Sequence, residues 1–338
     1  MNNIKKLFSL LFLCSNSMFF SMQHTHIVVI PGQNGLGGQN LSDVLPHYTN
    51  VHHVETPLYL PDFGQNRCIS YLEKTLQPVL QQAANKQISV ILHASSQGTA
   101  TALNYFAYAK EKSPIKTTKN KSKIQVHDNI TKDCVNLQKI KALILESVLL
   151  TGSSAIEHTL QMGNVPGAYY YMPYLAKCLY PFYVPAGRQA ISSCNHLPKD
   201  LPVIIMHAPQ DPQLSFQDSQ ALYAHLTQNG YKNVYFISVA DGYHVLLLRQ
   251  NSLETKVLQA ILHKHNLLTV KPEEEQELKK IDLTPYQPEA QPEWKQRFDS
   301  LKRKERNLYW IDWIVKTMLL AYASYYLFDH YTNTHAKL

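Results

Sequence analysis

The chain lacks the residue patterns that mark several common classes of protein. Its five cysteines include no CxxC pair and no spacing typical of zinc ligands, which argues against a zinc site. No sequence repeat recurs at the periods of solenoid proteins. We therefore expect no metal and no cofactor. With 45% hydrophobic residues over 338 positions, the chain should instead build a substantial globular core.

The one glycine-rich stretch, residues 31–38, lacks what phosphate binding requires. It follows an apolar run at 26–30, but Walker A needs Lys-Ser or Lys-Thr after its last glycine, and Gly38 is followed by Gln39 and Asn40. The spacing does not fit GxGxxG either. The stretch is therefore either an ordinary turn or an oxyanion loop, whose backbone amides face a nucleophile from a neighbouring strand.

Positive charge is in excess, at +7, but it is uneven along the chain. Basic residues gather in 110–141 and 302–306, which we interpret as solvated segments rather than a nucleic-acid groove. Residues 110–139 have too little apolar content to pack and are predicted to form a surface insertion. We expect no nucleic-acid partner.

The first 21 residues have the features of a secretion signal. Two lysines precede a short apolar run, and Ser15 and Ser17 supply small residues for cleavage after Ser17. An uncleaved hydrophobic N-terminus is the alternative. In an oxidising compartment Cys178 and Cys194 would be able to pair.

Strands and helices alternate along residues 22–268. Apolar, β-branched runs predict strands at 26–30, 51–60, 87–92, 142–148, 202–208 and 233–240. Apolar residues at steps of three and four predict a helix at 68–84. Further helices are predicted at 216–228, where Gly230 stands as a stop, and at 245–263, which is apolar. The alternation indicates an α/β fold with a mostly parallel central sheet and helices on both faces.

Three further segments have compositions of their own. Residues 149–198 are rich in tyrosine and interrupted by prolines, and we predict that they form an aromatic cap over the sheet's active edge. Simple aromatic packing is the alternative, and the two are compatible. Residues 269–300 look like a charged, proline-containing linker, and 301–338 are predicted to form a separate basic and aromatic helix.

Residues 308–328 of that helix are long enough to cross a bilayer, yet they contain Asp312 and Lys316, which can pair. Spanning a membrane, lying flat on one and packing on a protein remain open. If the chain is exported and the helix spans, the basic residues 302–306 would lie outside the cell, against the usual preference. We therefore expect an exported or membrane-associated protein whose helix does not span; a cytoplasmic protein with C-terminal membrane association is the alternative.

The strongest chemical signal is the stretch Ala94-Ser95-Ser96-Gln97-Gly98. It joins a predicted strand to an Ala-rich helix, and small residues two places before and after Ser96 allow a sharp turn. Such a turn would hold the Ser96 hydroxyl at the sheet's carboxyl edge beside the amides that open the helix.

Asp211 and His244 also follow predicted strands, at the edge where catalytic groups of parallel sheets gather. His244 would take the proton of Ser96, and Asp211 would orient the imidazole and stabilise its charged form. Glu146, at the end of another strand, is the alternative acid. The amide of Gln97, with that of Gln33 or Asn34, would hold the oxyanion.

With this order of Ser, Asp and His, the chain resembles the α/β-hydrolase superfamily over residues 25–268. Ala94 replaces the usual first glycine of the serine motif, and Pro31-Gly32-Gln33 stands where many members have His-Gly-x. The resemblance implies this fold and hydrolysis of an acyl group, and it does not fix the substrate. We expect a serine hydrolase that cleaves an ester or thioester through an acyl-enzyme, of the carboxylesterase, lipase or thioesterase type.

The aromatic cap favours an apolar or lipid-like acyl substrate. A peptidase or amidase with the same triad, and a catalytically silent binding protein with this fold, are the alternatives.

Overall fold

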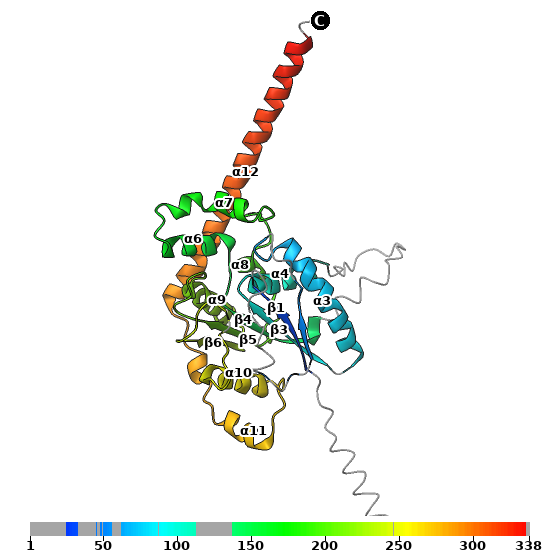
Figure 1. Ribbon diagram of the computed structural model, residues 1–338, viewed down its shortest axis with the longest axis vertical. Coiled ribbons are helices and arrows are strands. Elements are labelled where there is room, and N and C mark those ends of the chain that lie inside the picture. The colour runs from blue at the N-terminus through cyan, green and yellow to red at the C-terminus, as the bar shows by residue number, and fades with distance from the viewer. Residues whose placement is uncertain are drawn as a thin grey trace, which may run out of the picture.

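A parallel β-sheet lies at the centre of the computed structural model, which describes residues 25–32, 45, 48, 50–55, 62–86, 88–112, 137–245 and 247–335. The sheet has six strands in the order β2-β1-β3-β4-β5-β6. Figure 1 shows it in the body of the molecule, with helices around it. The strands are β1 Thr25–Ile30, β2 Asn50–His53, β3 Ser89–Ser95, β4 Ile140–Glu146, β5 Val203–His207 and β6 Val234–Ser238. The α/β fold with a parallel sheet is confirmed. The predicted signal, residues 1–21, and residues 113–136 of the predicted insertion lie outside the described residues.

The inner strands β1, β3, β4, β5 and β6 are buried and mostly apolar because helices cover both faces of the sheet, whereas the edge strand β2 is polar and only half-buried. In β1, Val28 and Ile30 belong to one core, while Ile27 and Val29 belong to the other. This alternation follows from the period of two in a strand, and a doubly covered sheet needs apolar residues at both phases.

Each face of the sheet is covered by its own set of helices, and each set forms a separate hydrophobic core. One core contains α3 (Asn66–Asn85), α4 (Gln97–Lys112), α9 (Phe216–Gln228) and the first half of α12 (Pro292–His335). The other contains α10 (Leu253–Lys264), backed by α11 (Pro272–Lys279). Three single turns are η2 (Leu137–Lys139), η3 (Cys194–His196) and η4 (Thr284–Tyr286).

Of the helices predicted at 68–84, 216–228 and 245–263, the first two are confirmed, and the start of the third is wrong. α9 has the predicted bounds, and α3 buries the predicted apolar stripe. The helix expected from Val245 begins only at Leu253, where the Ser252 side chain accepts a hydrogen bond from the Thr255 amide. Val245 has a positive φ of 54°, which a helix does not allow, and Leu247 is buried in the core from irregular backbone.

The predicted cap segment consists of helices α6 (Gly152–Met162), α7 (Ala168–Leu179) and α8 (Ala190–Ser193). It is anchored on the turn that precedes α3. The Phe63 ring lies 4.2 Å from that of Tyr180 and 5.0 Å from that of Tyr183. Gln65 Nε2 donates to the Val184 carbonyl, and Gln65 Oε1 accepts from the Val184 amide, at 2.7 and 3.1 Å.

The C-terminal part is more closely packed than a linker followed by a separate helix. Residues 269–300 contain α11, η4 and the first turns of α12, and the Tyr223 hydroxyl donates to the Pro288 carbonyl at 2.7 Å. α12 continues through the predicted boundary at residue 300. Within the described part of the chain, no helix combines the length and apolarity that crossing a membrane requires. Cys178 and Cys194 are both free thiols.

Candidate active site

Ser96 lies at a strained corner between β3 and α4. Its φ is 51°, and its amide donates to the Glu146 carbonyl of the neighbouring strand at 2.8 Å. Positive φ is uncommon for a residue with a side chain, and it turns the hydroxyl away from the sheet at the strand-to-helix corner. The predicted need for a small residue two places later has a specific cause: a Cβ on Gly98 would lie 2.2 Å from the Ile30 carbonyl oxygen.

The structure brings together the three residues that the sequence singled out. His244 Nε2 lies 3.0 Å from Ser96 Oγ, within hydrogen-bond distance. His244 Nδ1 lies 2.8 Å from Asp211 Oδ2 and 3.0 Å from Oδ1. Ser96 and Asp211 are buried, at 8% and 3% exposure, so these contacts form largely out of water.

Asp211 is held in place by its own loop and by a second histidine. Its Oδ1 accepts from the amides of Gln213 and Leu214, at 2.8 and 3.0 Å. His207 Nε2 lies 3.2 Å from Asp211 Oδ2, while its Nδ1 lies 2.5 Å from Ser219 Oγ. Burial alone would raise the pKa of Asp211, but the hydrogen bonds and charges of His207 and His244 outweigh it and hold that pKa well below its usual range. The carboxylate therefore stays ionised beside His244.

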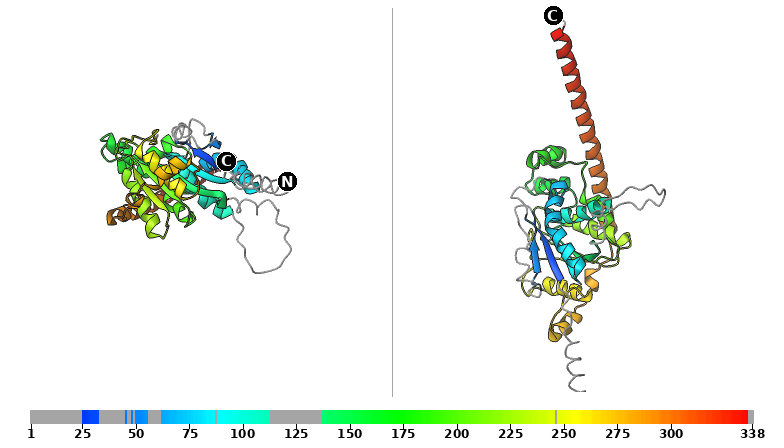
Figure 2. Two further views of the ribbon diagram at one scale, coloured as in Figure 1. Left: turned by 90° about the horizontal axis from the view of Figure 1, so that it is seen from below. Right: turned by 90° about the vertical axis from the view of Figure 1, so that its right-hand side faces the viewer.

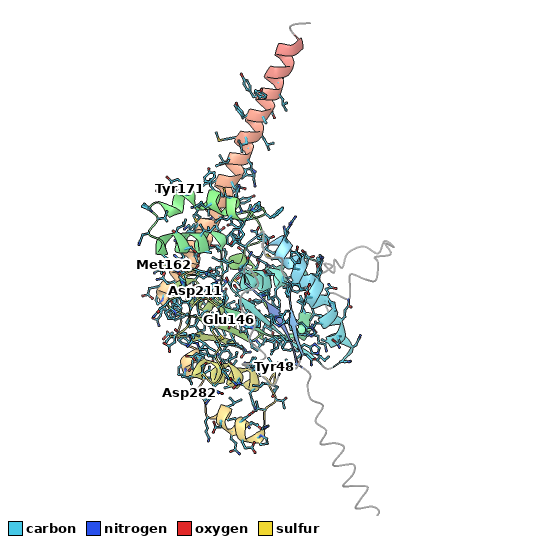
Figure 3. The ribbon with its side chains drawn as sticks, in the orientation of Figure 1. Tyr48, Glu146, Met162, Tyr171, Asp211 and Asp282 are labelled. Atoms are coloured by element: carbon cyan, nitrogen blue, oxygen red, sulfur yellow. The ribbon has the colours of Figure 1, made fainter. Side chains whose placement is uncertain are left out.

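The alternative acid, Glu146, faces a different group. Its Oε2 accepts from the Ser95 hydroxyl at 2.9 Å, and its Oε1 lies 3.5 Å from His93 Nε2. Figure 3 labels Glu146 and Asp211 in the body of the molecule, below the cap residues Met162 and Tyr171. Of the two candidate acids, Asp211 is the one that contacts His244.

His207 is the site residue that the sequence did not reveal. In the sequence, His207 is a histidine within the strand predicted at 202–208, and nothing in that pattern marks it as part of a site. The sequence signal for its role is its position four residues before Asp211. That spacing indicates a contact between the two side chains only if the chain from His207 to Asp211 turns back on itself. Asp241, three residues before His244, does not cap a helix, because the next helix in the described part of the chain starts at Leu253; its carbonyl accepts from Arg249 Nη2 at 2.8 Å.

One predicted oxyanion donor can be placed. Gln97 is the first residue of α4, so its amide is among those that open the helix, and its side-chain Nε2 donates to the Asp62 carbonyl at 3.0 Å. Gln33 and Asn34 lie outside the described residues. Ile30 is paired with Ala94 in the parallel sheet, so the loop that holds Gln33 and Asn34 starts beside the serine corner.

Ser96, Asp211 and His244 thus follow strands of the parallel sheet and lie within hydrogen-bond distance of one another in the order Ser96, His244, Asp211. Among the described residues, no group of three or more His, Cys, Asp or Glu side chains is placed to bind a metal ion.

Solved structures with a similar fold include several esterases. An esterase of Pyrococcus furiosus is 13% identical, with a TM-score of 0.45, over 72% of this chain and 82% of its own. Esterase 2 of Thermogutta terrifontis is 12% identical, with a TM-score of 0.47, over 74% and 86%. A carboxylesterase of Lactobacillus plantarum is 10% identical, with a TM-score of 0.41, over 74% and 88%. No protein-family model matches the chain, and no curated protein matches it in sequence. At sequence identities this low, the similarity to these structures is one of fold alone.

Proposed function

We propose that this protein is a serine hydrolase that cleaves a carboxylic ester or thioester through an acyl-enzyme intermediate. The observation that carries the proposal is the continuous hydrogen-bonded row from Ser96 Oγ through His244 to Asp211, with contacts of 3.0 and 2.8 Å. A serine hydroxyl is barely ionised at neutral pH, so it needs a base at this distance.

In the acylation step, Ser96 Oγ attacks the acyl carbon while His244 Nε2 takes the hydroxyl proton. The resulting imidazolium is stabilised by the Asp211 carboxylate, whose low pKa keeps it charged. Collapse of the tetrahedral intermediate breaks the bond to the leaving oxygen or sulfur, which receives the proton from His244. Water then repeats the sequence: His244 takes its proton, its oxygen adds to the acyl carbon, and Ser96 leaves with the proton.

The start of α4 supplies the electrostatic part of the mechanism. The Gln97 amide follows Ser96 directly, and the free amides of a helix N-terminus favour negative charge. They would stabilise the oxyanion that forms on the acyl carbonyl. A second amide from Gln33 or Asn34 is proposed on the other side of that oxygen.

The substrate class that we propose is an ester or thioester with an apolar acyl group. The support comes from the aromatic composition of the predicted cap segment, in which the rings of Tyr180 and Tyr183 pack on Phe63. His158 of α6 bonds the Asp211 carbonyl at 3.0 Å, so the cap reaches the catalytic loop itself.

A fluorophosphonate probe, which labels activated serines, tests the proposal. Wild type should be labelled on the peptide that contains Ser96, and Ser96→Ala should not be labelled. Ser147→Ala is the matched control, because Ser147 is also buried at the end of a central strand with a φ of 51°. It should label as wild type does.

An inert wild type, or full labelling of Ser96→Ala, would exclude a serine enzyme at this position and favour a silent binding protein. Hydrolysis rates for acyl esters, acyl thioesters and aminoacyl amides, each with the Ser96→Ala control, would then separate the proposed function from an amidase. Faster cleavage of amides would contradict the proposal.

A further inference from the structure

Helix α12 has two halves with different surroundings. In the first half, Phe298, Leu301 and Leu308 are buried in the core beside α9. In the second half the helix leaves the body and extends beyond it, as Figures 1 and 2 show from two directions. Every side chain from Lys316 to Phe328 is exposed.

The exposed half is apolar on all of its sides. Met318, Leu319 and Leu320 are 68%, 62% and 70% exposed, and successive residues of a helix point about 100° apart. Further along the helix, the aromatic side chains of Tyr325 and Phe328 are also exposed, at 68% and 67%. Between 313 and 328 the only charged residue is Lys316. A helix that faces water normally has a polar side, and this half lacks one.

Charge at the base of this half is positive. Lys302, Arg303 and Arg306 are exposed. Between residues 300 and 328 the acidic side chains are Glu305 and Asp312, and both are buried. Glu305 accepts from the Ser153 hydroxyl, and Asp312 pairs with Lys177 and Lys316. The charge presented to solvent there complements anionic lipid headgroups.

The cap continues the apolar surface. Lys177 of α7 pairs with Asp312 of α12, and Figure 1 shows α7 beside the point where α12 leaves the body. On α7, Tyr170, Tyr171, Tyr174 and Leu179 are between 62% and 77% exposed. Tyrosine and tryptophan are the side chains that favour the boundary between lipid and water.

We propose that residues 309–328 of α12, together with the exposed side chains of α7, form a lipid-docking surface. A protein groove or a second copy would cover one side of the helix, whereas acyl chains surround an inserted helix on every side. Residues 313–328 extend for roughly 24 Å at 1.5 Å per residue, which is less than the ~30 Å hydrocarbon core. The helix continues for seven more, mostly polar residues to His335. We therefore place it obliquely in one leaflet, with the basic residues at its base at the headgroups.

Docking of this kind places the cap against the membrane. Lys177–Asp312 and Lys304–Glu157 connect α12 to α7 and α6, and α6 reaches the catalytic loop through His158. The active site of the proposed hydrolase would then sit next to the lipid, but vesicle binding itself does not depend on that function.

Flotation of the full chain with vesicles tests the docking surface. Wild type should bind vesicles that contain anionic lipid more tightly than purely zwitterionic vesicles. Leu319→Asp/Leu320→Asp should weaken binding at least about tenfold, because both side chains are exposed in the folded chain and would become buried in lipid. The matched control is Leu253→Asp, which changes a leucine that is 61% exposed on α10 and should bind as wild type does.

Lipids brominated in their acyl chains should quench the fluorescence of wild type through Trp310 and Trp313.

Failure of wild type to bind either vesicle would overturn the proposal, as would equal binding of wild type and Leu319→Asp/Leu320→Asp. A dimer in sedimentation that this double variant dissociates, without vesicle binding, would identify a second copy as the occupant. Hydrolysis of a water-soluble ester should be equal in all three proteins, so a negative vesicle result leaves the active-site proposal untouched.

Discussion

At the scale of single residues, the site depends on which carboxylate holds His244. Ser96, Asp211 and His244 were recognisable in the sequence because each follows a strand, and strand ends of a parallel sheet meet at one edge. The sequence left Asp211 and Glu146 as alternatives, since both stand at strand ends. Only the three-dimensional path of the loops shows that Asp211, and not Glu146, contacts His244. It also shows that His207 contacts the Asp211 carboxylate.

Replacing each acid by its amide distinguishes their roles. Asp211→Asn should lower kcat/KM by about 10³- to 10⁴-fold with folding intact, because the amide no longer favours the imidazole tautomer that can accept the Ser96 proton. Glu146→Gln should lower kcat/KM less than about tenfold, since Glu146 contacts the Ser95 hydroxyl and His93 rather than His244. Steady-state hydrolysis of one ester by the two variants is the measurement, and the reverse ranking would reassign the acid.

The depressed pKa of Asp211 also predicts a pH dependence of stability. Hydrogen bonds from His207 and His244 lower this pKa despite burial, so the ionised form stabilises the folded chain above the unfolded pKa of about 3.9. That contribution disappears as the pH falls towards the folded pKa, by at most about 1.4 kcal/mol per pH unit. Urea unfolding between pH 7 and pH 3 should show the free-energy gap between wild type and Asp211→Asn narrowing on acidification. A constant gap would contradict the assigned interaction.

At the scale of elements, the serine corner is fixed by the close approach of α4 to the end of β1. Gly98→Ala should destabilise the chain by about 3 kcal/mol, because the new Cβ meets the Ile30 carbonyl and this backbone must shift. Gly230→Ala is the control: Gly230 has a φ of +81° with nothing within 4 Å of a Cβ, so only backbone strain of about 1 kcal/mol is expected. Urea unfolding of both variants measures the difference, and equal losses would argue against the close approach.

Helix boundaries were less predictable than strands. The buried strands stand out because their apolar runs are short and β-branched. The apolar residues that begin at Val245 predict the start of a helix, but Val245 has a positive φ and the helix begins only after its N-cap Ser252. A short apolar run identifies burial without identifying the backbone that provides it.

At the scale of the whole molecule, the C-terminal region is part of the fold rather than an appendage. Prolines and acidic residues in 269–300 suggested a linker, yet the segment packs on the body and leads directly into α12. The amino-acid composition of a segment shows how polar that segment is. It does not show that Phe298 and Leu301 pack in a core with residues of α9, which are distant in the sequence. Such contacts are invisible in the segment's own sequence.

The same substitution should therefore cost much more folding stability in the first half of α12 than in the second. Phe298→Ala removes a ring that is 1% exposed and stacked at 3.8 Å on His225, so it should destabilise the chain by about 3–5 kcal/mol. Phe328→Ala removes one that is 67% exposed on the same helix and should change stability by less than about 0.5 kcal/mol. Thermal and urea unfolding in the absence of lipid measure both. A small effect at Phe298 would mean that α12 is not held by the core. A large one at Phe328 would mean that its projecting half is packed on protein, because a side chain whose partner is lipid contributes to folding stability only when lipid is present.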